Sequence, residues 1–474
     1  MKNHQNEKKP FWRITINERK ALLFIGDVFS ATIALATALY FWARRDLWMD
    51  FTWEFLLERP PNWYYLLPVF WLLLLFELYD LKKASRKVDT IRNLAGSTAL
   101  ATFLYLMVFF VSEPKSLPRR GVAAFIASAA GLTLLWRLLY IRIFTAPLFL
   151  RRVVIIGAGR AGSTLAGQIK KMDPPPYTLV GFIDDDTSKV GTKIAGLSVL
   201  GKSADLMGII AKENITDIIF SISGDMQPSM YAAILNAEEK GIEVNTMPVV
   251  YEALFGRVPV SLLADDWVVK SFVDRAHASD TYELMKRTID IIGACIGIFL
   301  LVLFFPLISL IILLDDGFPI IFRQTRLGKS GQAFRLLKFR SMRRDAEDDG
   351  VARFAVENDE RVTRVGNFLR RSHLDELPQF INVLRGDISL VGPRAERPVI
   401  VKKLGKEIPF YRARLFIKPG VTGWAQINYQ YASNTKENTI KLEHDLYYIM
   451  HRNLLMDLLI IFRTLGAVFG FRGQ

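Results

Sequence analysis

Cysteine is almost absent from this sequence. Its 474 residues include a single cysteine, Cys295, which lies inside a long apolar run. One cysteine excludes disulfide frameworks within the chain and cysteine-based zinc sites. A thiol nucleophile is not expected in hydrocarbon surroundings, because the reactive thiolate needs a polar and positively charged neighbourhood. We therefore expect Cys295 to be a small buried apolar side chain.

Other signals are missing as well. The sequence has no internal repeats and no low-complexity segments, and no signal-peptide cleavage pattern follows the basic residues 1–20. Basic residues are spread along the chain without a nucleic-acid-binding motif, which argues against DNA or RNA as a partner. Residues 1–20 are predicted to be a basic cytoplasmic tail.

Apolar and positively charged residues are abundant. Hydrophobic residues make up 51% of the sequence, and the formal net charge is +14. A chain of this length suggests roughly three domains. The combination is typical of a membrane protein that faces anionic lipid, or of a protein that handles phosphorylated substrates.

The first third of the chain is predicted to cross a membrane. Residues 21–147 contain four apolar segments that each approach the roughly 20 residues of a spanning helix, at about 21–43, 63–79, 94–111 and 121–143. Cations follow the second segment and favour a cytoplasmic N-terminus: Lys82, Lys83, Arg86, Lys87 and Arg92. Two charged residues inside the segments, Asp27 and Arg137, lie near their cytoplasmic ends, and we expect both to snorkel to the interface.

A different composition begins at Arg151, with the pattern of a strand, a glycine-rich turn and a helix. Gly157, Gly159 and Gly162 form a GxGxxG turn, and the next strand ends at Asp184, where a ribose-binding carboxylate is expected. Residues 148–266 are predicted to form a Rossmann-like α/β domain. Either this domain binds a nucleotide, or it keeps the glycines for packing and serves regulation or dimerisation.

A second strongly apolar stretch, residues 285–316, follows a polar linker at 267–284. It is long enough to span a bilayer, but Pro306 in its middle removes a helical hydrogen bond. The proline is compatible with a kinked span or with a re-entrant hairpin whose irregular backbone finds partners in the protein. The residues alone leave both alternatives open.

Residues 370–394 carry the strongest chemical signal. Asp375 and Glu376 are adjacent carboxylates among arginines, and Pro378 is followed by apolar residues at helical spacing. Because proline is tolerated only in the first turn of a helix, a helix is predicted to begin near Asp375, with Asp375 at or beside its N-cap. Such a carboxylate lies where phosphate also binds. It either attacks phosphorus, binds a metal ion or merely caps the helix.

Cations surround this stretch. The group of Arg364, Arg370 and Arg371, and Arg394 further along the chain, are suited to clamp phosphates in a bidentate manner. Lys338 and Arg340 precede an acidic run. We interpret that run as a solvated loop: Asp345, Glu347, Asp348 and Asp349. The apolar-faced stretch at 453–473 is predicted to be a helix on the membrane surface.

Four motifs occur in order after the Pro306 segment: KFRSM, SHLDELPQ, NVLRGDISLVGPR and KPGVTGWAQIN. Over residues 284–474 they closely resemble the monotopic polyprenyl-phosphate phosphoglycosyl transferases, the bacterial sugar transferase family. The preceding regions resemble the long form of that family. The resemblance implies a membrane protein of α and α/β class, with four transmembrane helices, a Rossmann-like α/β domain, a re-entrant helix at 285–316 and a catalytic α/β domain at 317–474.

The resemblance also implies an activity. It predicts transfer of a sugar 1-phosphate from a UDP-sugar to undecaprenyl phosphate at the cytoplasmic face of the bacterial inner membrane, with release of UMP, as the start of exopolysaccharide, capsule or O-antigen synthesis. Asp375 would be the nucleophile that forms an aspartyl-phosphosugar intermediate, and Glu376 its partner. Mg²⁺ at Asp375 is the implied cofactor, and a homodimer is the family tendency.

Further residues are assigned through the same resemblance. Arg394 would bind phosphate, Lys338 and Arg340 would be active-site cations, and Gln426 a nucleotide contact. The re-entrant break maps to Phe305 and Pro306. Two positions depart from the family pattern: His373 replaces a usual Ser or Thr, and Ala395 replaces a usual proline. His373 is expected to do no catalytic work, with tuning of Asp375 as the alternative.

Two other functions compete with this one. The glycine-rich turn is compatible with an NAD-dependent enzyme that modifies sugar nucleotides, but three tyrosines near it lack the lysine four residues later that such enzymes need: Tyr177, Tyr231 and Tyr251. A catalytically inactive membrane scaffold is the second alternative, and the intact Asp375–Glu376 pair argues against it. Nothing in the sequence identifies the sugar.

Overall fold

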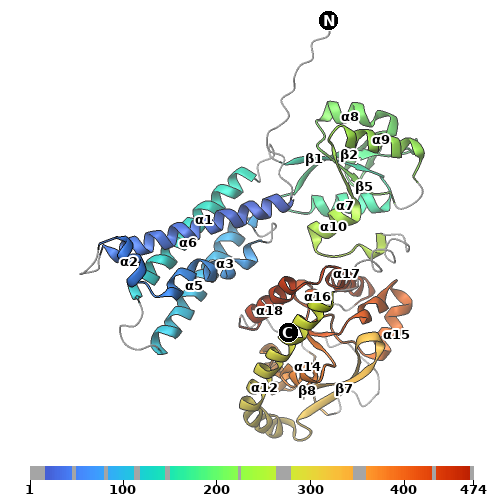
Figure 1. Cartoon of the computed structure of the whole chain (residues 1–474). Coiled ribbons are helices and arrows are strands. Elements are labelled where there is room, and N and C mark those ends of the chain that lie inside the picture. Colours follow the sequence, from blue (N-terminus) through green and yellow to red (C-terminus); the bar gives the residue numbers. More distant parts are fainter. Residues whose placement is uncertain are drawn as a thin grey trace. The chain divides into compact units, whose positions relative to one another are not determined.

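The structure is a computed structural model that describes residues 16–44, 50–79, 84–111, 118–144, 150–222, 226–262, 279–344, 359–429 and 434–469. The basic tail up to residue 15, most of the predicted linker, Lys82, Lys83 and the acidic run at 345–349 lie outside the described residues. The chain separates into two compact units, residues 1–247 and 248–474, and Figure 1 shows their elements.

Three long apolar helices dominate the first part of unit 1. They are α1 (Ile16–Ala43), α5 (Lys87–Val111) and α6 (Arg119–Phe144). Each is long and apolar enough to cross a membrane, as is one helix of unit 2. Short elements lie between α1 and α5, namely α2 (Trp53–Glu58) and α3 (Leu67–Leu74) with flanking 3-10 turns.

The second predicted segment, 63–79, differs from the continuous spanning helix expected. Its apolar helix covers only Asn62–Leu74, and the backbone leaves helical geometry at Leu75 before a 3-10 turn. Pro60 and Pro61 precede it, and proline disfavours extension of a helix in that direction. Thirteen residues rise by roughly 20 Å, less than the roughly 30 Å hydrocarbon core of a bilayer.

The expectation that Asp27 and Arg137 snorkel is wrong. Both side chains are fully buried, and the two charges pair with each other between α1 and α6. The Arg137 Nε donates to Asp27 Oδ1 at 3.2 Å, and its Nη1 donates to the carbonyl of Leu78 at 2.7 Å. Pairing satisfies both charges within the helix packing, so neither has to reach water.

The second part of unit 1 is the predicted Rossmann-like fold. Its sheet has the order β3-β4-β2-β1-β5-β6, and every pairing except β3 with β4 is parallel. The strands are β1 (Arg151–Ile156), β2 (Tyr177–Ile183), β3 (Lys193–Ile194), β4 (Leu197–Gly201), β5 (Asp217–Phe220) and β6 (Glu243–Thr246). The helices α7 (Arg160–Lys170), α8 (Leu206–Glu213) and α9 (Pro228–Glu239) connect them. After two partly buried arginines, β1 continues as four buried Val and Ile residues at 153–156, as expected for a strand buried on both faces.

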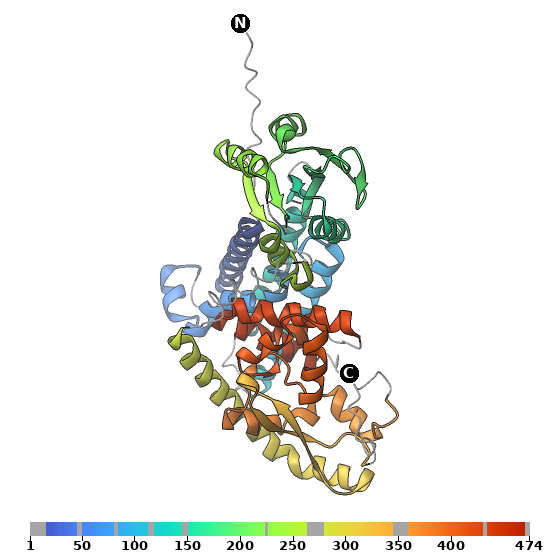
Figure 2. The same cartoon turned by 90° about the vertical axis from the view of Figure 1, so that its right-hand side faces the viewer.

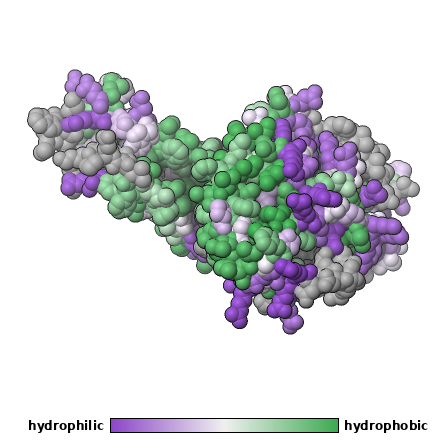
Figure 3. Space-filling view, turned by 90° about the horizontal axis from the view of Figure 1, so that it is seen from below, coloured by the Kyte–Doolittle hydropathy of each residue, from purple (hydrophilic) through white to green (hydrophobic). Residues whose placement is uncertain are grey.

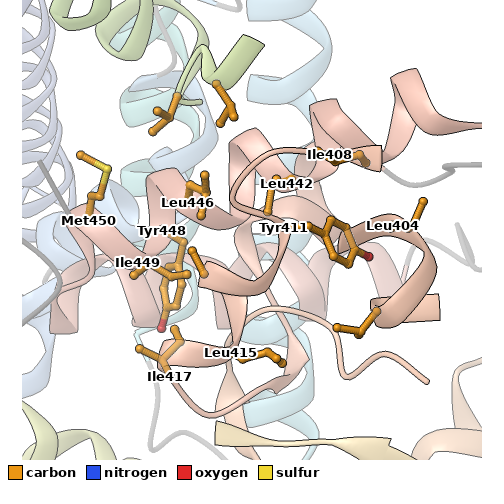
Figure 4. Close-up of a cluster of buried hydrophobic side chains, with 14 of the residues drawn as sticks. Leu404, Ile408, Tyr411, Leu415, Ile417, Leu442, Leu446, Tyr448, Ile449 and Met450 are labelled. Carbon is orange, nitrogen blue, oxygen red and sulfur yellow. The ribbon is translucent and has the colours of Figure 1, made fainter. Parts of the chain in front are cut away.

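Unit 2 begins inside helix α10 (Met247–Phe255) and packs around helix α17 (Thr435–His451). Its main core joins α17 to three further elements, and Figure 4 shows its side chains: α15 (Pro398–Glu407), the 3-10 helix η8 (Tyr411–Phe416) and α18 (Leu454–Phe469). Two small sheets complete the unit. One is the antiparallel hairpin of β7 (Ile321–Leu327) and β8 (Ala333–Phe339); the other pairs β9 (Ser389–Val391) with β10 (Gly420–Thr422) in parallel.

The apolar stretch around Pro306 forms one helix, α12 (Asp280–Asp316), without the interruption predicted at Phe305 and Pro306. Figure 2 shows that this helix, drawn in olive to yellow, bends partway along its length. Proline inside a helix removes one hydrogen bond and causes such bends. A bend loses one backbone hydrogen bond, whereas an interruption of the helix would leave several backbone groups unpaired and would cost more free energy.

The two faces of α12 differ. One face packs on the rest of unit 2. There Gly297 lets the helix approach so closely that an added Cβ would lie 2.2 Å from the Phe380 ring. The other face exposes large apolar side chains along its length, and Figure 3 shows a broad hydrophobic surface bordered by hydrophilic side chains. Cys295 is exposed on this helix, so the prediction that it is buried in the protein is wrong. An apolar face without protein cover is typical of contact with lipid.

Candidate active site

Asp375 and Glu376 lie on η7 (Leu374–Glu376), one turn of 3-10 helix between α13 (Arg364–Arg371) and α14 (Gln379–Arg385). The prediction that Asp375 caps a helix is wrong, because α14 begins only at Gln379 and its N-cap is Pro378. The chain enters the turn through His373, whose φ of 57° is in the left-handed region. This reversal directs the two adjacent carboxylates inward, and Asp375 is buried.

Lys338 on β8 lies next to both carboxylates. Its Nζ lies 2.5 Å from Glu376 Oε1 and 3.9 Å from Asp375 Oδ2. Its neighbour Phe339 is buried in an apolar cluster, and alternation along a strand turns Lys338 to the opposite face. Asn382 ties α14 to the edge of β8. Its Oδ1 accepts from the amide of Leu337, and its Nδ2 donates to the carbonyl of Arg335.

The two carboxylates differ in acidity. Burial opposes the ionisation of Glu376, but Lys338 and Arg394 outweigh it and lower the pKa of Glu376 to about 2. Burial raises the pKa of Asp375, Lys338 acts against this effect, and the negative charge of Glu376 adds to it. As the pH falls, Asp375 therefore takes up a proton before Glu376 does.

Arg394 approaches from the loop after β9. Its Nη2 lies 3.9 Å from Glu376 Oε1, and its side chain keeps 37% of its surface exposed. Glycines allow this loop to pack against the strand β10, because a Cβ on Gly392 or on Gly420 would lie within 3 Å of the opposite backbone. Arg394 thus extends a partly exposed guanidinium beside the dyad.

The other predicted cations occupy different places. Arg340 donates to the carbonyl of Gly317 at 2.5 Å and pairs with Asp316 at 3.2 Å, so it holds the end of α12. Arg371 is exposed, and among the described residues no contact joins it to the dyad. Its neighbour Arg370 faces inward instead, where it donates to Ser341 Oγ at 2.9 Å and acts against the raised pKa of Asp375.

Gln426 lies on the short helix α16 (Trp424–Asn428) next to the loop that carries Arg394. Its Nε2 donates to the carbonyl of Val421 at 3.0 Å, while its buried Oε1 has no hydrogen-bond partner among the described atoms. A Cβ on Gly423 would lie 2.1 Å from the carbonyl of Gly392, which shows how tightly the two motifs pack. Among the described contacts none joins Gln426 to the dyad, so its predicted contact with a nucleotide stays a prediction.

The dyad fits a divalent cation of the Mg²⁺ type. Within the described residues no group of three or more His, Cys, Asp or Glu side chains gathers around one point. Mg²⁺, however, is usually held by one or two carboxylates together with substrate phosphates and water. The buried carboxylate of Asp375, which has Lys338 only at 3.9 Å, offers one such ligand.

Sequence reasoning missed a buried cluster of ion pairs behind Arg394. Glu396 is its centre, and three cations from different elements surround it: Arg326, Arg414 and Lys441. Asp445 pairs with Arg414 at 2.7 Å. The only signal in the sequence is that Glu396 directly follows the GPR motif and Ala395, because the partners lie up to 70 residues away in the chain.

The glycine-rich turn of unit 1 is formed as predicted. Gly157 has a φ of 97°, and a Cβ on Gly162 would lie 2.1 Å from the carbonyl of Gly157. The carboxylate of Asp184 makes contacts within the domain: its Oδ2 accepts from the Ala158 amide at 2.8 Å and from Lys189 at 3.2 Å. Two of the three glycines are therefore explained by packing, whereas Gly159 has nothing within 4 Å of an added Cβ.

Parts of this chain are similar to known proteins. Residues 281–471 match the family described as bacterial sugar transferase, and residues 75–248 match a CoA-binding domain. The chain is 42% identical over 220 residues to an Aeromonas hydrophila UDP-N-acetylgalactosamine-undecaprenyl-phosphate N-acetylgalactosaminephosphotransferase, covering 46% of this chain and 50% of that protein. It is 44% identical to an Escherichia coli UDP-glucose:undecaprenyl-phosphate glucose-1-phosphate transferase, covering 39% and 40%.

A shorter relative is matched nearly from end to end. The chain is 39% identical over 189 residues to the exopolysaccharide production protein PSS of Rhizobium leguminosarum, covering 38% of this chain and 93% of that protein. The matches to the two longer relatives span half of their length or less. With the dyad, Lys338 and Arg394 brought together in the part that matches, this chain belongs to the bacterial sugar transferase family.

Proposed function

We propose that this protein transfers a sugar 1-phosphate from a UDP-sugar to undecaprenyl phosphate and releases UMP. The convergence of Asp375, Glu376, Lys338 and Arg394 carries the proposal. Two anionic substrates must react at a carboxylate, and the two nearby cations offset that accumulation of negative charge. The names of the Aeromonas and Escherichia coli relatives, which act on undecaprenyl phosphate, support the same chemistry.

In the first step, an Asp375 carboxylate oxygen attacks the phosphorus that carries the sugar. A bond forms from Asp375 to that phosphorus, and the bond to the bridging oxygen breaks, so that UMP leaves with the electron pair. Arg394 binds the diphosphate and stabilises the charge that grows on UMP. Glu376, kept ionised by Lys338, holds that lysine next to Asp375. No proton needs to be transferred.

In the second step, an oxygen of the lipid phosphate attacks the same phosphorus. The bond to Asp375 breaks, the carboxylate is restored, and the sugar is left on a lipid diphosphate. Using a covalent intermediate lets a water-soluble substrate and a lipid substrate occupy one site in turn. Mg²⁺, bound by Asp375 and phosphate oxygens, would supply further charge neutralisation.

The position of α12 supports a site at the membrane surface. Residues along its length bind to unit 2, from Lys286 with Asp457 at 3.1 Å, through Asp290 with Ser389 at 2.9 Å, to Gly317 with Arg340. A helix held to one domain at both ends cannot pass through the bilayer between them. We infer that α12 enters the membrane from the cytoplasmic side and returns, with its exposed apolar face in lipid. The UDP-sugar then reaches the site from the cytoplasm of the bacterial cell.

The test is UMP release by the purified full chain in nanodiscs, with Mg²⁺, undecaprenyl phosphate and a panel of UDP-sugars. We expect one UDP-sugar to give lipid-dependent UMP release, which Asp375→Asn abolishes and EDTA suppresses. This outcome would also identify the sugar. In the absence of lipid, the native protein should release UMP once per active site, because the covalent intermediate then has no acceptor.

Each alternative has its own result. UMP release that survives Asp375→Asn would mean that another residue is the nucleophile. Silence of the folded native protein across the whole panel would favour the scaffold function instead.

A further inference from the structure

The backbone next to Arg394, the predicted phosphate ligand, is fixed by hydrogen bonds to every carbonyl of residues 393–396. Residues 393–396 belong to no helix, yet each of their four carbonyls accepts a hydrogen bond. Gly420 N donates to Pro393 at 2.9 Å, and Leu327 N donates to Glu396 at 3.0 Å. The two carbonyls between them are bound by guanidinium groups from other elements, one of them buried and the other partly buried.

These guanidinium groups belong to Arg414 and Arg326. Arg414 Nη2 donates to the carbonyl of Arg394 at 3.3 Å, and Arg326 Nη1 donates to the carbonyl of Ala395 at 3.0 Å. Arg414 comes from η8 and Arg326 from β7, so the loop is bound from two sides. Arginine is suited to this role, because its planar fork can bind a carbonyl and a carboxylate at once.

One carboxylate holds both arginines. Glu396 Oε1 lies 3.4 Å from Arg414 Nη1, and Glu396 Oε2 lies 3.8 Å from Arg326 Nη1. Lys441 reaches the same carboxylate at 3.1 Å but contacts no carbonyl of the loop among the described contacts. Burial opposes ionisation of Glu396, but the surrounding cations hold its pKa at about 2. Glu396 is therefore charged at any physiological pH.

We propose that Glu396 is a positioning residue for Arg394: by fixing Arg414 and Arg326 it holds the carbonyls of residues 394 and 395, and thereby aims the Arg394 guanidinium at the diphosphate of a nucleotide substrate. The inference rests on the proposed function, which assigns Arg394 to that diphosphate. Glu396 itself faces the cluster of cations behind the loop. It acts on affinity for the diphosphate through the backbone and not by contact with the substrate.

The experiment is a double-mutant cycle on the full chain in nanodiscs, with Glu396→Gln, Arg394→Met and the pair together. The readouts are the equilibrium affinity for UDP, measured by titration calorimetry, and the KM for the UDP-sugar. We expect Glu396→Gln to weaken both about tenfold or more. In the Arg394→Met background it should change UDP affinity by less than about twofold, because Arg394 is already gone. An equal loss in both backgrounds would overturn the inference, since Glu396 would then act independently of Arg394.

Matched variants guard against misfolding of Glu396→Gln. Arg326→Gln releases Glu396 and the carbonyl of Ala395, whereas Lys441→Gln releases Glu396 alone. Both side chains are about equally exposed, at 16% and 15%. We expect Arg326→Gln to weaken UDP binding clearly and Lys441→Gln to leave it within about twofold. Equal effects of the two would overturn the inference. Glu396→Asp should restore part of the affinity.

Failure of this inference differs from failure of the proposed function. A protein that releases UMP but shows an additive cycle refutes only the role of Glu396. A protein that binds UDP with a coupled cycle but releases no UMP refutes only the transfer. Native protein that binds no UDP and turns over no UDP-sugar refutes both.

Discussion

Lys338 and Glu376 form the shortest cation–carboxylate contact in the candidate active site, with 2.5 Å between Nζ and Oε1. The lysine comes from a β-hairpin and the glutamate from a 3-10 turn, 38 residues apart in the chain. In the proposed reaction the two carboxylates have different roles: Glu376 holds the lysine, and Asp375 is the nucleophile. The predictions below depend on contacts of this kind.

Replacing Lys338 by methionine should slow the first half of the reaction. Glu376 would lose its counter-ion and its pKa would rise, and a charge-assisted hydrogen bond of roughly 1.5–3 kcal/mol would be removed. We expect UMP release to fall by about tenfold to a hundredfold. Single-turnover UMP release without lipid acceptor measures this step alone. Lys402→Met, on the exposed side of α15, is the control and should behave like the native protein.

Substitutions of the two adjacent arginines of α13 should affect the rate of UMP release to very different extents. Arg370 faces the dyad and bonds to Ser341, whereas Arg371 is exposed. We therefore expect Arg370→Gln to lower the rate of UMP release by about tenfold or more, and Arg371→Gln to stay within about twofold of the native rate. Steady-state UMP release by the two purified variants tests the pair, and the reverse order would show that the exposed arginine binds substrate.

The stability of unit 2 should depend on the protonation of Glu443. Burial raises the pKa of Glu443 to about 7, although Arg257 at 3.6 Å opposes this. The ordinary pKa in the unfolded chain is about 4.5. Because the folded pKa is the higher one, the stabilising effect of the neutral carboxyl is fully present below pH 4.5. This stabilising effect is lost as the pH rises to 7, and the free energy of unfolding then falls by at most about 3 kcal/mol.

Glu443→Gln removes this dependence. We expect the variant to gain stability over the native protein at pH 8 and little at pH 4.5, measured as the difference in unfolding midpoint in nanodiscs. The native profile has to be subtracted because the neighbouring His444 also titrates. Burial lowers the pKa of His444 to about 4, so its protonation destabilises the folded protein as the pH falls into the acid range. Glu239→Gln, on an exposed position of α9, should show no pH-dependent difference.

Loss of one partner from the buried pair of Asp27 and Arg137 should destabilise the protein strongly, whereas loss of both should destabilise it little. Arg137→Leu leaves an unpaired carboxylate between α1 and α6, which costs about 3–5 kcal/mol for buried pairs in proteins. The double variant Asp27→Leu with Arg137→Leu removes both charges and should recover most of the loss. Thermal unfolding in nanodiscs measures both. If the double variant were as unstable as the single one, the loss would come from the packing of the two side chains and not from the mutual neutralisation of their charges.

The sequence alone was sufficient for the local features. Periodicity and composition predicted the long apolar helices, and the order of strand, glycine turn and helix predicted the parallel sheet of unit 1. The resemblance to a known family assigned Asp375, Glu376, Lys338 and Arg394 to one site, and in the structure these four side chains lie next to one another. Their roles in a reaction stay predictions. These features depend on neighbours in the chain or on motifs whose spacing is visible in the residues.

Only the tertiary structure decided which charged side chains contact each other. Nothing local distinguishes Arg370 from Arg371, or tells that Arg340 turns to Gly317 while Lys338 turns to Glu376. The partners of Glu396 come from β7, η8 and α17, and Asp27 meets Arg137 across 110 residues. A sequence pattern reports how a segment folds on itself, whereas the partner of a buried charge is set by the packing of segments that are distant in the chain.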